Sequence, residues 1–202
     1  MMTKKRPILF SAPMVRAILD GRKIQTRRVV KPQPGDGDFA SPIICETYAP
    51  VLVNQHGEDY PGDEVFGFAN EEQGWKCPYG SPGDRLWVRE TWAHSTDYDG
   101  QFLLDHNPVL YRATPVVEPS RWRPSIFMPR WASRITLEIT AVCAERLQSI
   151  LLSDVAAEGL HPNNEAGWDT TDPYRDLWDS INGKKYPWAS NPYVWVVEFR
   201  RV

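Results

Sequence analysis

The sequence predicts one α+β domain, with strands in a mixed or closed sheet and a few short helices. Residues 135–141 alternate apolar and polar side chains, as a strand with one buried face does. Other apolar runs are short and end at turn residues, and no regular strand–helix–strand alternation is present. The 202 residues, 42% of them hydrophobic, suit a single domain, and a small barrel would hide the edges of its strands.

The N-terminal residues predict a strand, a helix and a second strand. Residues 7–10 are apolar, and Ser11 can cap a helix whose first turn contains Pro13. Gly21 ends this helix as a C′ residue would. The segment Gly21–Arg28 therefore leaves a helix and runs into a strand that starts at Val29.

Residues 31–82 are rich in proline and glycine, which predicts a loop-rich insertion in the single domain 1–202. Within the insertion we expect a hairpin, with strand pieces at 43–44 and 51–53. Residues 160–192 are aromatic and acidic, and they form a second elaboration.

The second half of the chain predicts further strands and two helices. The Pro82-Gly83-Asp84 turn precedes a strand expected over 85–92, in which Leu86, Val88 and Glu90 share one face. The other expected elements are strands at 109–113, 135–141 and 193–200, helices at 153–158 and 172–181, and loops at 97–107 and 123–132.

The composition limits the classes of partner and site. The formal net charge is −3, so a nucleic-acid partner must be argued from local basic patches, which lie in the first thirty residues. The three cysteines have no C-x-x-C spacing, so we expect no disulfide framework, no metal and no cofactor. No apolar run approaches the roughly 20 residues of a membrane span, and no signal peptide is evident, which predicts a cytoplasmic protein.

The segment Gly21–Arg28 carries the chemistry that the sequence offers. The amine of Lys23 and the hydroxyl of Thr26 lie three residues apart, so in a turn or a short helical stretch they would face one cleft. Arg28 adds a planar set of donors suited to a phosphate or a carbonyl. The alternative interpretation is a solvated basic turn without a binding role.

The pattern Gly21-x-Lys23-x-x-Thr26-x-Arg28 resembles the signature of the ASCH superfamily, whose fold is a small β-barrel similar to the RNA-binding PUA domain. Two more stretches resemble elements of such barrels, and overall the chain is most similar to ASCH-like proteins encoded by phages and prophages. The resemblance covers roughly residues 6–30, 82–92, 108–160 and 192–200.

The resemblance implies a site and a substrate class. Some members of the superfamily are amidohydrolases that act on N4-acetylcytidine, and their catalytic set is similar to Lys23, Thr26 and a strand glutamate, here Glu138. In that mechanism Thr26 is the nucleophile, Lys23 is its base, and Glu138 passes a proton to the leaving amine. Glu90 is the rival carboxylate, with a salt bridge to arginine as its structural alternative. Other members are described as ribonucleases or RNA binders, so enzyme activity stays open.

Two other classes of function stay open. In a binding module, Arg27 and Arg28 would contact phosphate and Trp87, Trp122 or Trp131 would stack on a base, with Glu90 among the binding residues. The partner would then be RNA or a modified nucleoside. In a phage structural or host-interaction protein, the barrel would serve only as a scaffold.

Overall fold

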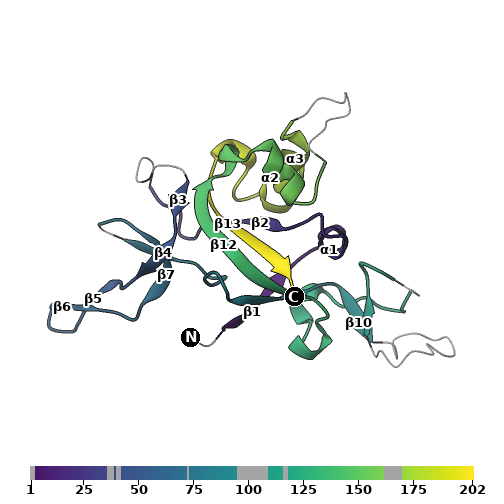
Figure 1. Cartoon of the computed structure of the whole chain (residues 1–202), viewed down its shortest axis with the longest axis horizontal. Coiled ribbons are helices and arrows are strands. Elements are labelled where there is room, and N and C mark those ends of the chain that lie inside the picture. Colours follow the sequence, from purple (N-terminus) through teal and green to yellow (C-terminus); the bar gives the residue numbers. More distant parts are fainter. Residues whose placement is uncertain are drawn as a thin grey trace.

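The computed structural model describes residues 3–35, 39, 42–71, 73–94, 109–115, 118–161 and 170–202. These residues form a strand-rich α+β fold with three α-helices, which confirms the predicted class (Figure 1). The strands are β1 (Lys5–Leu9), β2 (Gln25–Val29), β3 (Ile43–Ile44), β4 (Glu46–Tyr48), β5 (Val51–Val53), β6 (Asp59–Pro61), β7 (Val65–Ala69), β8 (Gly74–Lys76), β9 (Arg85–Arg89), β10 (Trp92–His94), β11 (Val109–Tyr111), β12 (Thr136–Arg146) and β13 (Tyr193–Arg201). The helices are α1 (Ala12–Leu19), α2 (Leu152–Ala157) and α3 (Asp172–Asn182).

The main sheet has the strand order β1-β9-β12-β13-β2, with β3 also paired to β12. β1 runs parallel to β9, and the other pairs are antiparallel. The expected closed barrel is not formed, because β1 and β2 remain at the two edges of this order and share no strand pairing. One side-chain contact spans these edges: Nη2 of Arg28 donates to the Leu9 carbonyl at 2.6 Å.

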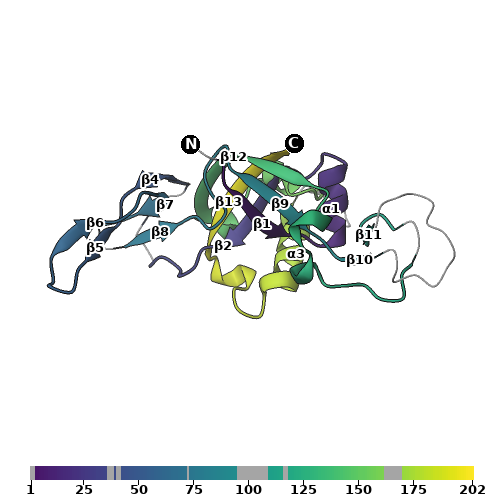
Figure 2. The ribbon, with the colours of Figure 1, turned by 90° about the horizontal axis from the view of Figure 1, so that it is seen from below.

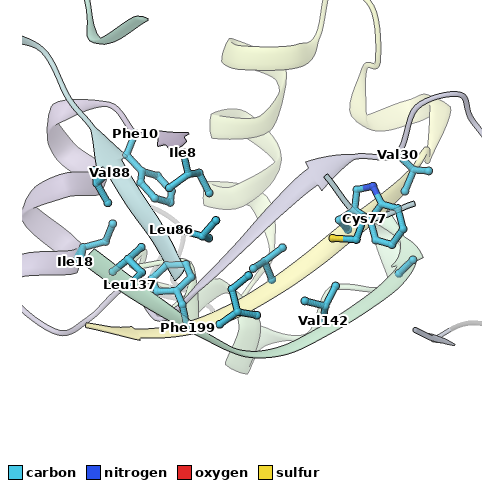
Figure 3. Close-up of a cluster of buried hydrophobic side chains, with 14 of the residues drawn as sticks. Ile8, Phe10, Ile18, Val30, Cys77, Leu86, Val88, Leu137, Val142 and Phe199 are labelled. Carbon is cyan, nitrogen blue, oxygen red and sulfur yellow. The ribbon is translucent and has the colours of Figure 1, made fainter. Parts of the chain in front are cut away.

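The first five residues of strand β13, Tyr193–Val197, are buried on both faces, which explains their continuous apolar sequence. One face contributes Tyr193, Trp195, Val197 and Phe199 to the main core, drawn in part in Figure 3. The other face contributes Val194 and Val196 to a second cluster, which also contains Val155, Tyr174 and Trp178 of α2 and α3. The two C-terminal helices therefore cover the outside of the β13–β2 part of the sheet (Figure 1).

Helix α1 matches its sequence signals. Ser11 is its extended N-cap residue, a proline lies in its first turn, and Gly21 has φ of +74° just beyond Asp20, its C-cap. Buried Val15 and Ile18 pack into the main core. The helix thereby fixes where the following segment enters the sheet.

The insertion at 31–82 contains more strand than the sequence indicates. The expected pieces at 43–44 and 51–53 are present as β3 and β5, but β4, β7 and β8 also form a three-stranded sheet, and β5 pairs with β6. These strands project from one side of the body, and β10 and β11 lie toward the opposite side (Figure 2). Aromatic packing anchors the insertion, because Phe68 lies 5.0 Å from Trp195, centroid to centroid.

Two expected strand boundaries are wrong. The strand after Gly21 begins at Gln25 rather than Val29, because Gln25–Val29 pair with β13. The single strand expected over 85–92 is divided into β9 and β10, because Glu90 turns toward Arg134 and β10 pairs with β11 instead. The helices expected at 153–158 and 172–181 are confirmed within one residue at each end. The loop expected at 97–107 lies outside the described residues.

Candidate functional site

The centre of the candidate site is a buried ion pair between Lys23 and Glu158. Lys23 is 2% exposed, and its Nζ donates to the Glu158 carboxylate and, at 3.1 Å, to the Glu158 carbonyl. The other carboxylate oxygen of Glu158 accepts the backbone N–H of Arg27 at 2.7 Å. Both oxygens of this carboxylate are thus held, which fixes its orientation beside the ammonium group.

Backbone contacts hold Lys23 against the C-terminal end of α2. Lys23 and Glu158 form an isolated β-bridge, and the Ile24 N–H donates to the Ala157 carbonyl at 2.9 Å. Gly159 follows with φ of +88°, and a Cβ there would lie 3.0 Å from the Cβ of Lys23. A larger residue at 159 would therefore strain the backbone and press on the lysine.

Arg27, which follows Thr26 in β2, also belongs to this cluster. Its Nη2 contacts Glu145 at 2.8 Å and Asp154 at 2.9 Å, and its Nη1 donates to Gln25 at 2.6 Å. Burial acts against the cation, but Glu145 and then Glu158 outweigh it and raise the pKa of Arg27. Because its donors are occupied, Arg27 acts as a structural anchor for Glu158 rather than as a ligand for phosphate.

Thr26 and Arg28 lie on the wall of one hollow together with Glu158. This hollow, of about 50 Å³, is closed on its far side by α3; its lining includes Thr26, Arg28, Glu158, Met14, Tyr174 and Trp178. The guanidinium of Arg28 and the Nζ of Lys23 lie 5.2 and 5.7 Å from the ring centre of Phe10. Within the described part of the chain, the buried Nε of Arg28 has no hydrogen-bond partner. Arg28 therefore combines a place in the wall of the hollow with one donor that no described protein group occupies.

The surroundings of Lys23 favour a neutral amine more than water does. Burial is the largest influence and lowers the pKa of Lys23 below its ordinary value of 10.5. Contact with Glu158 opposes this change, whereas the positive charges of Arg28 and Arg27 reinforce it. Lys23 therefore loses its proton more readily than a lysine in water does, while hydrogen bonds hold the Glu158 carboxylate beside it.

Glu138 does not join this cluster. It lies on β12 opposite Arg200 of β13, and its carboxylate accepts from Nη2 of Arg200 at 2.6 Å. The Arg200 side chain is 67% exposed, so this is a surface ion pair on the outer face of the sheet. The structure thus places Glu158, rather than Glu138, beside Lys23.

Glu90 is 1% exposed and is paired with an arginine. Its two carboxylate oxygens accept from Nε and Nη2 of Arg134 at 2.9 and 3.0 Å. The backbone N–H of Glu90 points to the sulfur of Met128 at 3.4 Å. Glu90 therefore has the structural role expected as its alternative, a salt bridge with an arginine, and it is not part of the Lys23–Glu158 pair.

The candidate stacking residues lie on a different face from the hollow. Trp87 faces outward from β9, with the guanidinium groups of Arg89 and Arg130 at 5.4 and 5.7 Å from its ring centre. Trp131 is 60% exposed, and Trp122 donates to Glu118 at 2.9 Å. None of the three lines the hollow of Thr26.

The cysteines offer little nucleophilic character. Burial raises the pKa of Cys45 to about 12 and that of Cys143 to about 11, so both thiols stay protonated at neutral pH. Among the described residues, no group of three or more His, Cys, Asp or Glu is arranged to hold a metal ion.

Glu158 was not predicted from the sequence as a site residue, although its position at a helix end is one signal for it. Glu158 is the C-cap of α2, and a carboxylate at a helix C-terminus is opposed by the helix dipole. Lys or Arg is the favourable choice there, so a glutamate needs a tertiary partner. That partner, Lys23, is 135 residues away along the chain, a distance that local pattern analysis does not span.

No protein-family model, curated protein or solved structure matches this chain. The helices in the described ranges are all too short or too polar to cross a membrane.

Proposed function

We propose that this chain is a hydrolase that removes an acyl group from a modified nucleoside such as N4-acetylcytidine, with Thr26, Lys23 and Glu158 as its catalytic residues. The observation that carries the proposal is the buried Lys23–Glu158 pair next to a hollow that Thr26 and Arg28 line. A buried lysine–carboxylate pair adds little to stability, because both ions lose their hydration on folding. Its presence in the core therefore favours a role in function.

The coupled pair supplies the base for the first step. The amine of Lys23, made accessible by its lowered pKa, takes the hydroxyl proton of Thr26 as the oxygen attacks the acyl carbon. The C–O bond forms, and the carbonyl electron pair moves to oxygen to give a tetrahedral intermediate. Glu158 keeps the protonated lysine in place during this step.

The same pair then completes the reaction. The tetrahedral intermediate collapses, the bond from carbon to the exocyclic nitrogen breaks, and that nitrogen receives the proton from the pair. Cytidine leaves and the acyl group remains as an ester on Thr26. Water then attacks the ester carbon as Lys23 accepts one water proton. The bond from that carbon to the Thr26 oxygen breaks, Lys23 returns the proton to this oxygen, and a carboxylic acid and free Thr26 are released.

Arg28 has the features of an oxyanion donor. Its Nη2 is occupied by the Leu9 carbonyl, which orients the guanidinium, and its Nε is buried without a partner. A fixed donor in a dry site stabilises developing negative charge at little reorganisation cost. Arg28 is therefore better suited to stabilising the negative charge of the transition state than to binding a solvated phosphate.

The size of the hollow limits how the substrate binds. A volume of about 50 Å³ has room for a few waters or a small acyl group, but not for a whole nucleoside. The base and sugar would lie outside the hollow, against Ile181 and Asn182, the lining residues near the end of α3 that are not buried. In this arrangement α3 sets how large an acyl group the enzyme accepts.

A fold-level proposal accompanies this function. We infer that the sheet β1-β9-β12-β13-β2 is a PUA-like, ASCH-type core that carries the insertion 31–82. Support comes from the strand order, the curved sheet packed around one core, and the positions of Lys23 just before β2 and of Thr26 within β2. The ribonuclease activity known in other ASCH-like proteins is the competing chemistry for the same three residues.

The experiment compares two substitutions at Thr26. Purified protein is incubated with N4-acetylcytidine and, separately, with short RNAs, and the products are identified by mass spectrometry. Thr26→Val keeps the shape but lacks the hydroxyl, so we expect cytidine formation to fall by about 10³-fold or more. Thr26→Ser keeps a nucleophile and should retain measurable turnover.

An acetyl adduct on the peptide that contains Thr26, trapped at early times, would identify the nucleophile directly. Equal turnover by the wild type and Thr26→Val would remove Thr26 from the mechanism. Cleaved RNA without deacetylation, lost in Thr26→Val, would redirect the site to a ribonuclease.

A further inference from the structure

A second surface of the molecule, remote from the hollow, combines exposed aromatic rings with arginines. We call residues 120–132 the aromatic ledge. Phe127 and Trp131 are 70% and 60% exposed, and Arg121 and Arg130 are exposed as well. A large open hollow lies along it, lined by Ser120, Arg121, Arg123, Pro124 and Phe127. Rings of this size on a soluble surface mark an interaction site more often than a packing accident.

The ledge is rigidly attached to the sheet, although its rings face solvent. Met128 and Ala132, each next to an exposed ring, are 0% and 1% exposed. Nε of Arg89 donates to the Met128 carbonyl at 3.1 Å, and Nη2 of the same arginine donates to the Ile126 carbonyl. The buried Glu90–Arg134 pair fixes the end of the ledge. Phe127 and Trp131 are therefore presented in fixed positions, which lowers the entropy cost of binding.

Cations alternate with the rings along this face. Arg130 lies over Trp87 at 5.7 Å, and Arg123 lies over Trp92 at 5.2 Å. Across the described residues 118–134, four arginines accompany one glutamate at Glu118 and none of the aspartates of the chain. The ledge is therefore locally basic, although the whole chain has a net charge of −3.

We propose that the aromatic ledge binds single-stranded RNA, with bases stacked on Phe127 and Trp131 and phosphates contacted by Arg121 and Arg130. Flat exposed rings suit unpaired bases, and interleaved guanidinium groups suit the backbone that joins them. An apolar protein segment would leave the arginines unpaired, and a duplex would hide its bases from the rings. The basic charge and the aromatic rings together favour a single strand.

A series of contacts connects the ledge with the proposed catalytic hollow. Arg28 in the hollow donates to the Leu9 carbonyl, Leu9 pairs with Arg89 between β1 and β9, and Arg89 donates to the ledge. The choice of RNA over DNA rests on the proposed function, whose substrate is a ribonucleoside; the existence of the binding surface does not.

The test measures binding by the anisotropy of a fluorescein-labelled oligouridylate of about 16 nucleotides, the upper end of single-strand site sizes. We expect Phe127→Ala and Trp131→Ala each to weaken binding by roughly 5- to 150-fold, the effect of losing one stacked base. Arg121→Gln and Arg130→Gln should each reduce the salt slope of log K by about 0.7.

Matched control variants lie on the opposite side of the molecule. Tyr60→Ala removes an exposed ring from β6, and Lys76→Gln removes an exposed cation from β8. Both should leave oligouridylate binding unchanged. Thermal unfolding of every variant checks the fold, because the substituted ledge side chains are solvent-exposed and contribute little to the core.

Specific outcomes would overturn the proposal. Unchanged oligouridylate binding in both ring variants would show that the ledge is not the RNA-binding surface. Binding of a polyglutamate peptide as tight as that of oligouridylate would show that the ligand class is an acidic protein surface. Equal or tighter binding of the matching DNA would overturn the choice of RNA. Turnover of free N4-acetylcytidine is measured in the same variants: normal turnover without RNA binding rejects only the ledge, and RNA binding without turnover rejects only the hydrolase.

Discussion

The hollow proposed as catalytic and the aromatic ledge both combine cations with aromatic rings, but in opposite environments. Beside the hollow, Lys23 is 2% exposed and is bonded to Glu158, which lines it; on the ledge, the Trp131 side chain is 60% exposed. Burial makes the protonation of a lysine adjustable, which suits proton transfer. Exposure leaves a ring free to provide contact area, which suits binding. The difference in solvent access thus separates a site for chemistry from a site for recognition.

The largest effect is expected when the buried ion pair is broken on one side. Lys23→Met leaves the Glu158 carboxylate buried without its ammonium partner, so turnover should be lost and the free energy of unfolding should fall by about 3 kcal/mol. The double variant Lys23→Met/Glu158→Gln removes both charges and should regain most of that stability without any turnover. Urea denaturation and the deacetylation assay measure the two effects.

The pH dependence of stability checks the same pair. Because the pKa of Lys23 is lowered from 10.5 by folding, the unfolded chain binds more protons between the two values. The contribution of Lys23 therefore makes the folded state more stable as pH rises toward 10.5. The stability of the wild type relative to the double variant should therefore increase as pH rises toward 10.5, and a difference independent of pH would contradict the lowered pKa.

An intermediate effect is expected at the anchor of the ledge. Arg134→Met leaves Glu90 buried without its cation, which should lower the free energy of unfolding by about 1–3 kcal/mol, since the arginine is partly exposed. RNA binding should weaken, although Arg134 is not among the proposed contacts, because Phe127 and Trp131 lose their fixed positions. Turnover of the free nucleoside should stay normal; loss of turnover with intact RNA binding would reverse the assignment of the two regions.

The smallest effect is expected at Glu138. Its pair with Arg200 lies on the surface, and such pairs contribute about 0–1 kcal/mol. Glu138→Gln should therefore leave both stability and turnover nearly unchanged, in contrast to Glu158→Gln in the same assays. A loss of turnover comparable to that of Glu158→Gln would return Glu138 to the mechanism.

The local sequence predicted those elements whose signals lie within a few residues. The Ser11, Pro13 and Gly21 signals located α1, and the alternation over 135–141 located the centre of β12. The strand start at Gln25 and the break after Arg89 were not predicted. Pairing with β13 decided the first, and the contact of Glu90 with Arg134 decided the second.

For the site, the sequence by itself determined which groups were available: an amine at 23, a hydroxyl at 26 and a guanidinium at 28, on a segment that leaves a helix at a glycine. Only the tertiary structure decided which carboxylate meets the amine. The sequence resemblance pointed to Glu138, but β13 brings Arg200 to that carboxylate, and the end of α2 brings Glu158 to Lys23 instead. The physical reason is that a buried charge requires a partner in space, and the partner's distance along the chain plays no part in that requirement.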